Sequence, residues 1–515
     1  MGMTNDQREA DARDSGPLGR IVVRGVALNA AGFALTQAIT LASGIVLAHL
    51  ASPQDFGLYA SATILLGYTG MLVDSGMAAA LIQRRDRVDE AASTALAANV
   101  ASGLLVSAAL AASAPLLGLY FQSRTVELVA SVMAGVVLLD ALVLVPDALL
   151  QRRFSFYRRL VLSPSYALAY GVAAGIACGL GLGIWGLVIG RYAGLALEVI
   201  LIWALVDWRP RREHVSLAMW RSLVRFGRHI FAQSFLTQLR YTVRTALLGR
   251  LVNIDAVGQY RMADMISNLP REAWLASSAY VLFPAFARIS HDRSRLEAAL
   301  LRTMRWMAIV TLPASALLVP LGPAAAVLLL GERWLPAGYA IMALAAIPLS
   351  GGVNSVLSEA VKGAGRPEIL SRTAMFMAVT TPILLVAFVP LGLVGIAAAG
   401  SIASLLGTAF LARLVVRALD VPLPAILATL RPAALATCAL LAALFPLQWL
   451  VVRAETHDTL VGLALMAGEV ALGLVVYLAT LRALDPQAVS TMTGAARLGW
   501  TRLATELGRS TSGWQ

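Results

Sequence analysis

Residues 127–153 read ELVASVMAGVVLLDALVLVPDALLQRR, and this stretch decides the fold class. A long, mostly apolar run is followed at once by a pair of arginines, Arg152 and Arg153. About 20 apolar residues are enough to cross a bilayer as a helix, whereas a transmembrane β-strand needs only about ten residues of alternating character. The stretch therefore predicts a membrane-spanning helix with a basic end.

The composition of the whole chain agrees with that reading. Of 515 residues, 58% are hydrophobic and only 14% are charged, and the mean hydropathy is +0.75. Soluble domains carry about 25% charged residues, so the composition excludes an ordinary cytosolic enzyme, a disordered chain and a secreted disulfide scaffold. The net charge of +12 comes without the interleaved basic and aromatic face of nucleic-acid modules, so no nucleic-acid partner is predicted.

Similar apolar segments recur along the chain, separated by short polar breaks. They predict an all-α polytopic membrane protein with about fourteen transmembrane helices, because helices satisfy their own backbone hydrogen bonds in lipid. The expected spans are 28–48, 58–82, 92–117, 127–150, 160–180, 184–206, 225–248, 257–286, 303–330, 335–360, 371–390, 392–417, 427–451 and 459–481.

Basic residues indicate how these spans are oriented. With fourteen spans, 32 of the 41 basic residues fall on one side, four on the other and five inside spans. Cytoplasmic loops collect lysine and arginine, so both termini are expected in the cytoplasm. The basic side is also expected to attract anionic lipids.

The chain repeats a short motif. Asp55-Phe-Gly-Leu-Tyr59 opens the second span, and Asp255-Ala-Val-Gly-Gln-Tyr260 opens the eighth, 200 to 201 residues later. An even number of spans per repeat puts both halves in the membrane in the same direction, as a parallel repeat of two lobes around a cavity. The expected parts are an N-terminal tail (1–27), an N-lobe of six spans (28–206), a cytoplasmic linker (207–224), a C-lobe of six spans (225–417), two extra spans (418–481) and a C-terminal tail (482–515).

Several short motifs, in order over more than half of the chain, resemble one known family. The chain is similar to the Wzx-like oligosaccharide flippases, or polysaccharide transport proteins, of the multidrug/oligosaccharidyl-lipid/polysaccharide exporter superfamily. The matching segments are LASPQDFGLY (50–59), DSG (74–76), ALIQRRD (80–86), LLQRRF (149–154), LGR (248–250), GQY (258–260), Pro270, FPAF (283–286) and GERW (331–334) with Ala337.

The resemblance implies a multi-pass transporter of the bacterial cytoplasmic (inner) membrane and not an enzyme. Its cargo would be an undecaprenyl-diphosphate-linked oligosaccharide, the repeat unit of a polysaccharide, O-antigen or exopolysaccharide. It would move this lipid from the inner to the outer leaflet by alternating access, beside a polysaccharide polymerase and export machinery. Two alternatives stay open: a lipid II flippase of peptidoglycan synthesis, and a membrane-embedded glycosyltransferase or polymerase.

Arginines inside spans are the best candidates for the transport site. Burying a charge in the membrane costs at least about 2.5 kcal/mol, so such residues usually serve function or an ion pair. A guanidinium suits bidentate capture of phosphate oxygens. We expect Arg240, Arg244, Arg261 and Arg271 to line a cavity that holds the anionic headgroup.

The competing interpretation is that these charges form structural ion pairs. Arg240 and Arg244 have no acid nearby in sequence, whereas the other in-span arginines do. The candidates for a coupling-ion site or for ion pairs are Asp74, Asp140, Asp264, Glu272, Arg191 and Glu198, with Asp264 expected beside Arg261, Glu272 beside Arg271 and Glu198 beside Arg191. Asp74 can also stabilise the Asp-Ser-Gly bend.

No cofactor or metal is expected. The chain lacks a GxxxxGK[ST] loop for ATP, its five histidines are scattered, and Cys178 and Cys438 each lie in an apolar run. We therefore predict a site without catalytic residues.

Overall fold

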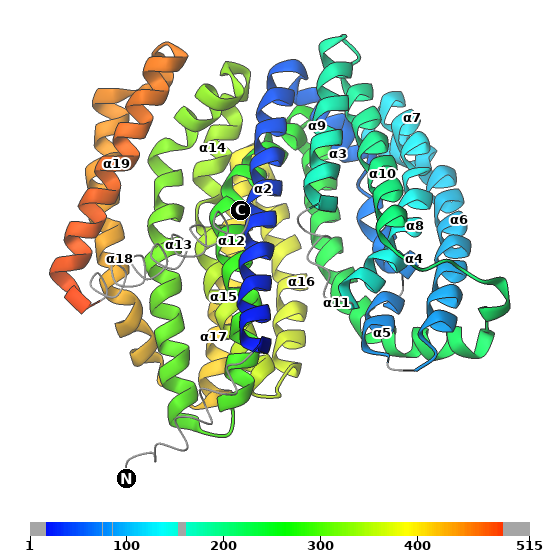
Figure 1. The fold of residues 1–515 in the computed structure, drawn as a ribbon. Helices are drawn as coiled ribbons and strands as arrows, with labels where there is room; N and C mark the ends of the chain where they lie inside the picture. The colour runs from blue at the N-terminus through cyan, green and yellow to red at the C-terminus, as the bar shows by residue number, and fades with distance from the viewer. Residues whose placement is uncertain (1–16, 75, 85, 153–160, 488–515) are drawn as a thin grey trace, which may run out of the picture.

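A computed structural model describes residues 17–74, 76–84, 86–152 and 161–487. The remaining residues, including most of both expected tails, lie outside the described part. Within it every regular element is an α-, 3-10 or π-helix, which confirms the all-α fold class. Figure 1 shows the helices as two groups, with α2 between them.

The first group holds the elements of the expected N-lobe. They are α2 (Pro17–Leu50), α3 (Pro53–Ala62), η1 (Leu66–Tyr68), α4 (Thr69–Asp74), α5 (Met77–Gln83), α6 (Val88–Phe121), α7 (Arg124–Met133), α8 (Val136–Arg152), α9 (Ser163–Gly179) and α10 (Ile184–Leu205).

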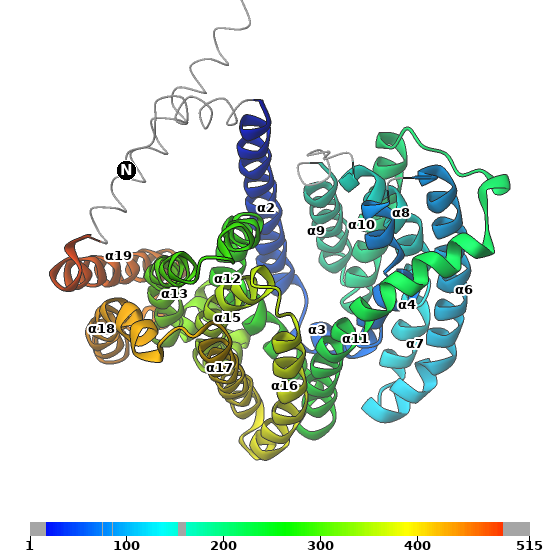
Figure 2. The same cartoon turned by 90° about the horizontal axis from the view of Figure 1, so that it is seen from below.

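The rest of the chain follows a short 3-10 turn, η3, and forms the second group apart from α11, which lies along the first group in Figure 2. Its elements are η3 (Arg212–His214), α11 (Leu217–Leu247), η4 (Leu248–Val252), α12 (Ile254–Ile289), α13 (Arg293–Leu330), η5 (Glu332–Trp334), α14 (Leu335–Leu344), α15 (Ala346–Gly363), α16 (Glu368–Phe388), η6 (Val389–Leu391), α17 (Gly392–Leu419), α18 (Leu423–Pro446), η7 (Leu447–Val452), η8 (Ala454–Thr456) and α19 (Thr459–Leu484).

Eight stretches of the described chain are long and apolar enough to cross a membrane, or ten if two bent helix pairs each count as one span. One of the eight, Glu368–Leu419, covers both α16 and α17, which pack against each other. The helices α9, α11 and α12 are not among the stretches that meet these criteria. α12 carries several of the charges that were expected inside spans. The number fourteen therefore stays a prediction.

The expected second span, 58–82, is not one straight helix. α3 and the following Leu66–Asp74 segment meet at 48°, and α5 begins only after Gly76. Gly76 has a φ of 78°, a left-handed conformation that glycine adopts without strain. The expected tenth span is also bent, by 40°, between α14 and α15.

Two helices connect the groups. α11 packs against α5 and α6 of the first group and against α16 of the second, and α2 contacts α9 on one side and α12 and α13 on the other. Seen from below in Figure 2, α11 crosses the first group while α18 and α19 lie at the far edge beside α13. The two C-terminal helices thus pack on the outside of the second group.

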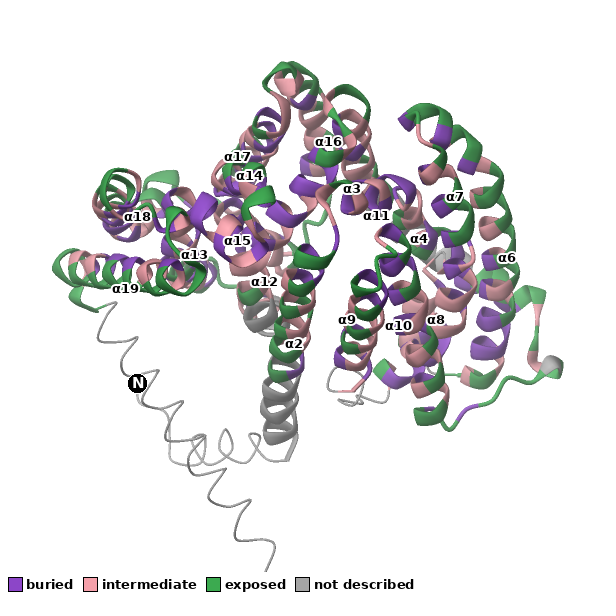
Figure 3. Ribbon diagram, turned by 90° about the horizontal axis from the view of Figure 1, so that it is seen from above, coloured by how far each residue is buried: buried purple, intermediate pink, exposed green. Residues whose placement is uncertain are grey.

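The outward sides of the molecule suit lipid. Figure 3 shows exposed residues along the outer sides of α6, α7 and α19. Large apolar side chains are among them, including Leu105, Leu119 and Leu460. Apolar surface of this extent on a helical protein of this composition is the surface of a membrane protein.

The repeated motifs meet each other at the joint between the groups. Ser52 caps α3 and Asn253 caps α12, 201 residues apart, each accepting a hydrogen bond from a backbone N–H in the first turn of its helix. A Cβ atom on Gly57 would overlap the carbonyl oxygen of Ile254, and one on Gly258 would overlap that of Pro53. The two contacts are equivalent under the repeat, so α3 and α12 cross as symmetry-related helices at a contact that only glycine permits. We call this crossing the Gly57/Gly258 contact.

Other groups hold the same end of the molecule together. Arg333 donates to the carbonyl oxygens of Ala48 and His49, at 2.5 and 2.6 Å, and Trp334 donates to that of Ala48 at 3.0 Å. The Trp334 ring is fully buried and lies edge-on to Phe56, with the ring centres 5.5 Å apart. These bonds fasten η5 to the end of α2, where α3 begins.

Candidate functional site

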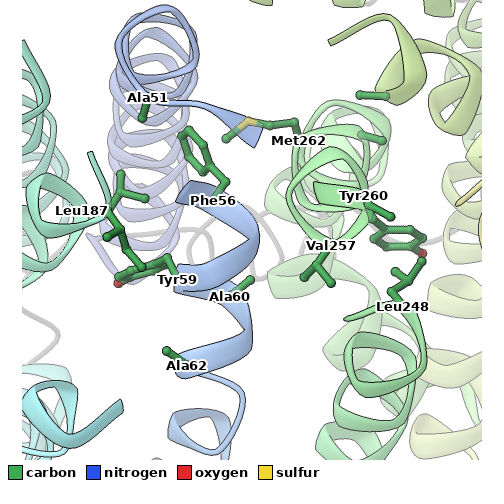
Figure 4. Close-up of a cluster of buried hydrophobic side chains, with 14 of the residues drawn as sticks. Ala51, Phe56, Tyr59, Ala60, Ala62, Leu187, Leu248, Val257, Tyr260 and Met262 are labelled. Carbon is green, nitrogen blue, oxygen red and sulfur yellow. The ribbon is translucent and has the colours of Figure 1, made fainter. Parts of the chain in front are cut away.

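A cavity of about 640 Å³ lies between the two groups of helices. Its walls come from α2, α3, α9 and α10 on one side and from α11 and α12 on the other. Figure 4 shows three of its lining residues: Phe56 of α3 lies beside Met262 of α12, while Tyr59 points to the other side of α3, towards Leu187. The polar side chains that line it are Thr36, Thr40, Ser43, Tyr59, Thr63, Ser163, Tyr166, Tyr170, Arg191, Glu198, Gln238, Tyr241 and Arg261.

Arg261 is the cation of α12 in this cavity. Its guanidinium carbon lies 5.5 Å from the centre of the Tyr59 ring, a cation–π distance. In the described part of the chain, Arg261 forms no ion pair within 4 Å. Asp264, its expected partner, lies beside Arg244 instead. A half-buried guanidinium whose neighbours are tyrosines leaves its charge available to an anionic ligand.

Arg191 enters the same cavity from α10. It donates a 2.6 Å hydrogen bond to the Tyr166 hydroxyl and lies 3.6 Å from a carboxylate oxygen of Asp140. We expected Glu198 as its partner; instead the ion pair is with Asp140, on α8. A second cavity of about 330 Å³, lined by Asp140, Arg191 and Glu198, adjoins this position.

Arg244 lines a third cavity, of about 370 Å³, which shares Tyr241 and Arg261 with the first. Its guanidinium lies 4.4 Å from the centre of the Tyr260 ring and 5.2 Å from that of Tyr241, and an Asp264 oxygen is 4.0 Å away. Arg244 has no acid close to it in the sequence, but Asp264 on the next helix, α12, lies beside it in the structure.

Arg240 and Arg271 are placed differently. Arg240 donates to the sulfur of Met377 on α16 at 3.3 Å, and Arg271 pairs with Glu272 at 2.6 Å and packs against Gly351. Neither lines any of the three cavities. Of the four arginines expected in the cavity, the structure brings together Arg244 and Arg261, and it adds Arg191.

The tyrosines of the cavity were missed by sequence reasoning. Tyr59 and Tyr260 close the two copies of the repeated motif, and each carries an arginine over its ring, Arg261 and Arg244 respectively. The duplication itself was the signal that could have found them, since a tyrosine kept in both copies occupies equivalent positions at the joint. Sugar rings stack on aromatic faces, so these tyrosines suit a glycan as the arginines suit a phosphate.

Asp74 has a local role. Its two carboxylate oxygens accept hydrogen bonds from the backbone N–H groups of Gly76, at 3.1 Å, and Ala78, at 2.8 Å. These bonds hold the start of α5 after the break, so the geometry matches the bend interpretation.

Asp74→Asn is therefore expected to keep export, because an amide oxygen can still accept one of the two bonds. Asp74→Ala is expected to lower the amount of folded protein, since loss of such a cap costs about 1 kcal/mol. Quantified export and membrane abundance of the two variants check this. A protein carrying Asp74→Asn that is abundant but fails to export would instead make Asp74 a coupling residue.

Within the described residues no three His, Cys, Asp or Glu side chains form a group able to hold a metal. The two cysteines are free, Cys178 buried and Cys438 exposed. The cavities are lined by fixed cations, by the carboxylates of Asp140, Glu198 and Asp264, and by hydroxyls and aromatic faces.

Comparison with known proteins places the chain in a family. Residues 46–338 match the model described as polysaccharide biosynthesis protein. The chain is 24% identical over 339 residues to the succinoglycan biosynthesis transport protein ExoT of Rhizobium meliloti (strain 1021), covering 65% of this chain and 68% of that protein. It is 23% identical over 369 residues to the lipopolysaccharide biosynthesis protein WzxC of Escherichia coli (strain K12), covering 70% and 72%.

Solved structures share the fold. The lipid II flippase MurJ, in an inward closed conformation, superposes with a TM-score of 0.73 at 14% identity, covering 90% of this chain and 99% of that one. An inward-facing multidrug resistance transporter of the MATE family, in the MOP superfamily, gives 0.62 at 18% identity, covering 75% and 95%. These likenesses show a multi-pass helical membrane fold, and the resemblance expected from the motifs is confirmed. Because the family model matches more than half of its residues, the chain belongs to the polysaccharide biosynthesis protein family.

Proposed function

We propose that this protein flips an undecaprenyl-diphosphate-linked oligosaccharide from the inner to the outer leaflet of the bacterial cytoplasmic membrane. The observation that carries the proposal is the cavity between the lobes, in which Arg261 and Arg191 lie among four tyrosines. The cargo is a repeat unit of a polysaccharide, O-antigen or exopolysaccharide. The named relatives act in polysaccharide biosynthesis, and one of them is a transport protein, which supports a transporter over an enzyme.

Arginines bind the diphosphate of the headgroup, and tyrosines bind its first sugars. The diphosphate pairs with the guanidinium of Arg261, and Arg244 in the adjoining cavity takes further phosphate oxygens. The first sugars stack on Tyr59, Tyr166 and Tyr170, while the polyprenyl tail stays in the lipid. A cavity of about 640 Å³ lies within the usual range of roughly 300–1,000 Å³ for small-ligand sites, enough for the diphosphate and the first sugars.

Alternating access supplies the movement. With both termini in the cytoplasm, as the basic residues indicate, the end of α2 and the Gly57/Gly258 contact lie at the outer face of the membrane. The lobes are then sealed to the outside by this contact and by Arg333, and the cavity belongs to a state that loads from the cytoplasm. Release outside requires the Gly57/Gly258 contact to separate. Anionic lipids at the basic cytoplasmic face and a polysaccharide polymerase at the outer face are the expected partners.

The lipid II alternative has one specific support, the fold shared with MurJ. Lipid II also carries a diphosphate, so the arginines alone do not separate the two cargoes. We favour the polysaccharide cargo because the family match and the curated relatives are both of polysaccharide biosynthesis.

A deletion strain tests the proposal. It is expected to lose the surface polymer and to accumulate the undecaprenyl-linked repeat unit on the cytoplasmic leaflet, with a plasmid copy of the gene restoring both. The repeat unit is counted by mass spectrometry of extracted lipids, and its leaflet by whether a periplasmic glycosidase can reach it in intact spheroplasts.

Each other outcome contradicts the proposal in a different way. Normal polymer export in the deletion strain removes the transport role. Accumulation of lipid II with cell lysis identifies the peptidoglycan alternative. A repeat unit that reaches the outer leaflet but stays unpolymerised identifies a polymerase.

A further inference from the structure

Outside the two lobes, α19 carries a buried acidic side chain that the transport site does not use. Glu469 is 3% exposed, and neither of its carboxylate oxygens has a hydrogen-bond partner among the described residues. It belongs to the side of α19 that packs inward, together with Gly462, Gly473, Tyr477 and Leu481. This side faces α13 and α18.

No described basic side chain compensates Glu469. The charged residues of α13 lie in its first turns, between Arg293 and Arg305, and Arg305 pairs there with Asp485 beyond the far end of α19. The charged residue of α18, Arg431, lies near the start of that helix. The charged group that acts on Glu469 electrostatically is another acid, Glu455 of η8, whose own carboxylate accepts a 2.6 Å hydrogen bond from Gln448.

An unpaired carboxylate in such an environment holds a proton, because an isolated buried charge costs far more than a neutral acid. The neighbouring Tyr477 shows what a neutral hydroxyl does in this interface. Pro313 has no N–H to bond the carbonyl of Ile309, four residues before it, and the Tyr477 hydroxyl donates to that oxygen at 3.1 Å.

The same arrangement recurs two turns further along. Pro320 leaves the carbonyl of Ala316 without its helical donor, seven residues beyond Ile309 on α13. Glu469 lies eight residues before Tyr477 on α19, and the α13–α19 contact is antiparallel, as the Gly462–Leu328 and Gly473–Leu317 contacts show. Glu469 and Ala316 therefore lie at a similar level of the interface, as Tyr477 and Ile309 do.

We propose that Glu469 is a proton-binding site in the C-terminal helix pair, and that the bound proton holds α19 against α13. Half-buried Glu455 of η8, at the end of the molecule where α19 begins, connects the site to that face. When the proton leaves, the charge requires water, and the α13–α19 interface loosens.

Labelling with dicyclohexylcarbodiimide, an apolar reagent that reacts with protonated carboxyl groups, tests whether Glu469 holds a proton. The O–H of a protonated carboxyl group adds across one C=N bond of the reagent: oxygen bonds to carbon, the proton moves to nitrogen, and acyl transfer then gives a stable N-acylurea with no leaving group. Glu469 in membranes is expected to be labelled at neutral pH, and less so as the pH is raised, as read by peptide mass spectrometry. Glu455, which is hydrogen-bonded and partly exposed, is expected to stay unlabelled.

The thermal stability of purified protein tests the packing. Glu469→Gln keeps shape and neutrality, so its melting temperature is expected to fall less between neutral and alkaline pH than that of the wild type. Glu455→Gln keeps Glu469 but removes the neighbouring negative charge that favours its proton, so its melting temperature is expected to begin to fall at a lower pH than that of the wild type. An unlabelled Glu469 at neutral pH overturns the proton site, and parallel pH profiles of wild type and Glu469→Gln overturn its effect on packing.

Discussion

Gly258→Ala is expected to abolish export while leaving the protein in the membrane at near wild-type abundance. The new Cβ would overlap the carbonyl oxygen of Pro53, a backbone atom that cannot rotate away. Overpacking of this kind costs about 1–3 kcal/mol in the state that contains the contact. That cost shifts the balance between closed and open forms by roughly 5- to 150-fold towards separation of the lobes at this end.

Gly57→Ala is expected to behave in the same way, because its Cβ would meet the carbonyl oxygen of Ile254. Gly175→Ala in α9 is the matched control: no atom lies within 4 Å of its Cβ, and alanine is the better helix former by about 1 kcal/mol. It is expected to export normally.

A cysteine reporter separates an open joint from a misfolded protein. Thr63→Cys, in the cavity wall, is combined with Cys178→Ala and Cys438→Ala, and whole cells are treated with a membrane-impermeant maleimide. Labelling is expected with Gly258→Ala and not with the parent. An abundant Gly258→Ala protein that exports normally, or that stays unlabelled, would show that the Gly57/Gly258 contact is not the outer closure.

The Gly57/Gly258 contact could be predicted from the sequence only in part. The motif around Gly57 recurs around Gly258, and its recurrence predicted two equivalent lobes. That the two glycines lie against each other's helices depends on how the lobes are placed, and no local pattern contains that information. Trp334 illustrates the same limit, since a tryptophan near a predicted span end is buried in the joint rather than exposed to lipid.

The residues of the candidate site were also predicted only in part, because the arrangement of the helices decides which side chains meet. Hydropathy locates a charge within a span, but each residue turns the helix by about 100°, so the partner of the charge is set by the rotation of two helices. Arg244 and Arg240 lie four residues apart on α11, yet Arg244 lies beside Asp264 and a cavity while Arg240 contacts Met377. Arg191, expected to pair with Glu198 on its own helix, pairs with Asp140 across the N-lobe.

Hydropathy also did not predict the breaks within spans. Residues 58–82 are apolar enough for one helix, and the window that predicts a span averages over the turn at Gly76. The Asp-Ser-Gly sequence at 74–76 did indicate a bend, and Asp74 does hold the following turn. Local hydrogen-bonding chemistry was thus more informative than apolar length at this position.

Arg261→Ala is expected to have the second large effect, reducing export at least tenfold at unchanged membrane abundance. Arg261 lines two of the three cavities, and in the described part of the chain no acid lies within ion-pair distance of it. Hydrogen bonds to charged groups contribute about 1.5–3 kcal/mol, which corresponds to roughly 10- to 150-fold in affinity for a diphosphate. Arg261→Lys keeps the charge but not the planar fork, so an intermediate effect is expected.

Arg240→Ala is the matched control, since Arg240 is also a membrane arginine but contacts Met377 outside the cavities. It is expected to export normally, so a double Arg240→Ala, Arg244→Ala variant should be no worse than Arg244→Ala alone. Binding is measured on purified protein by the rise in melting temperature with farnesyl diphosphate, with farnesol as the uncharged probe. The diphosphate is expected to stabilise wild type and Arg240→Ala but not Arg261→Ala. Equal stabilisation of all three, with normal export by Arg261→Ala, would remove Arg261 from the headgroup site and leave the cavity without its central cation.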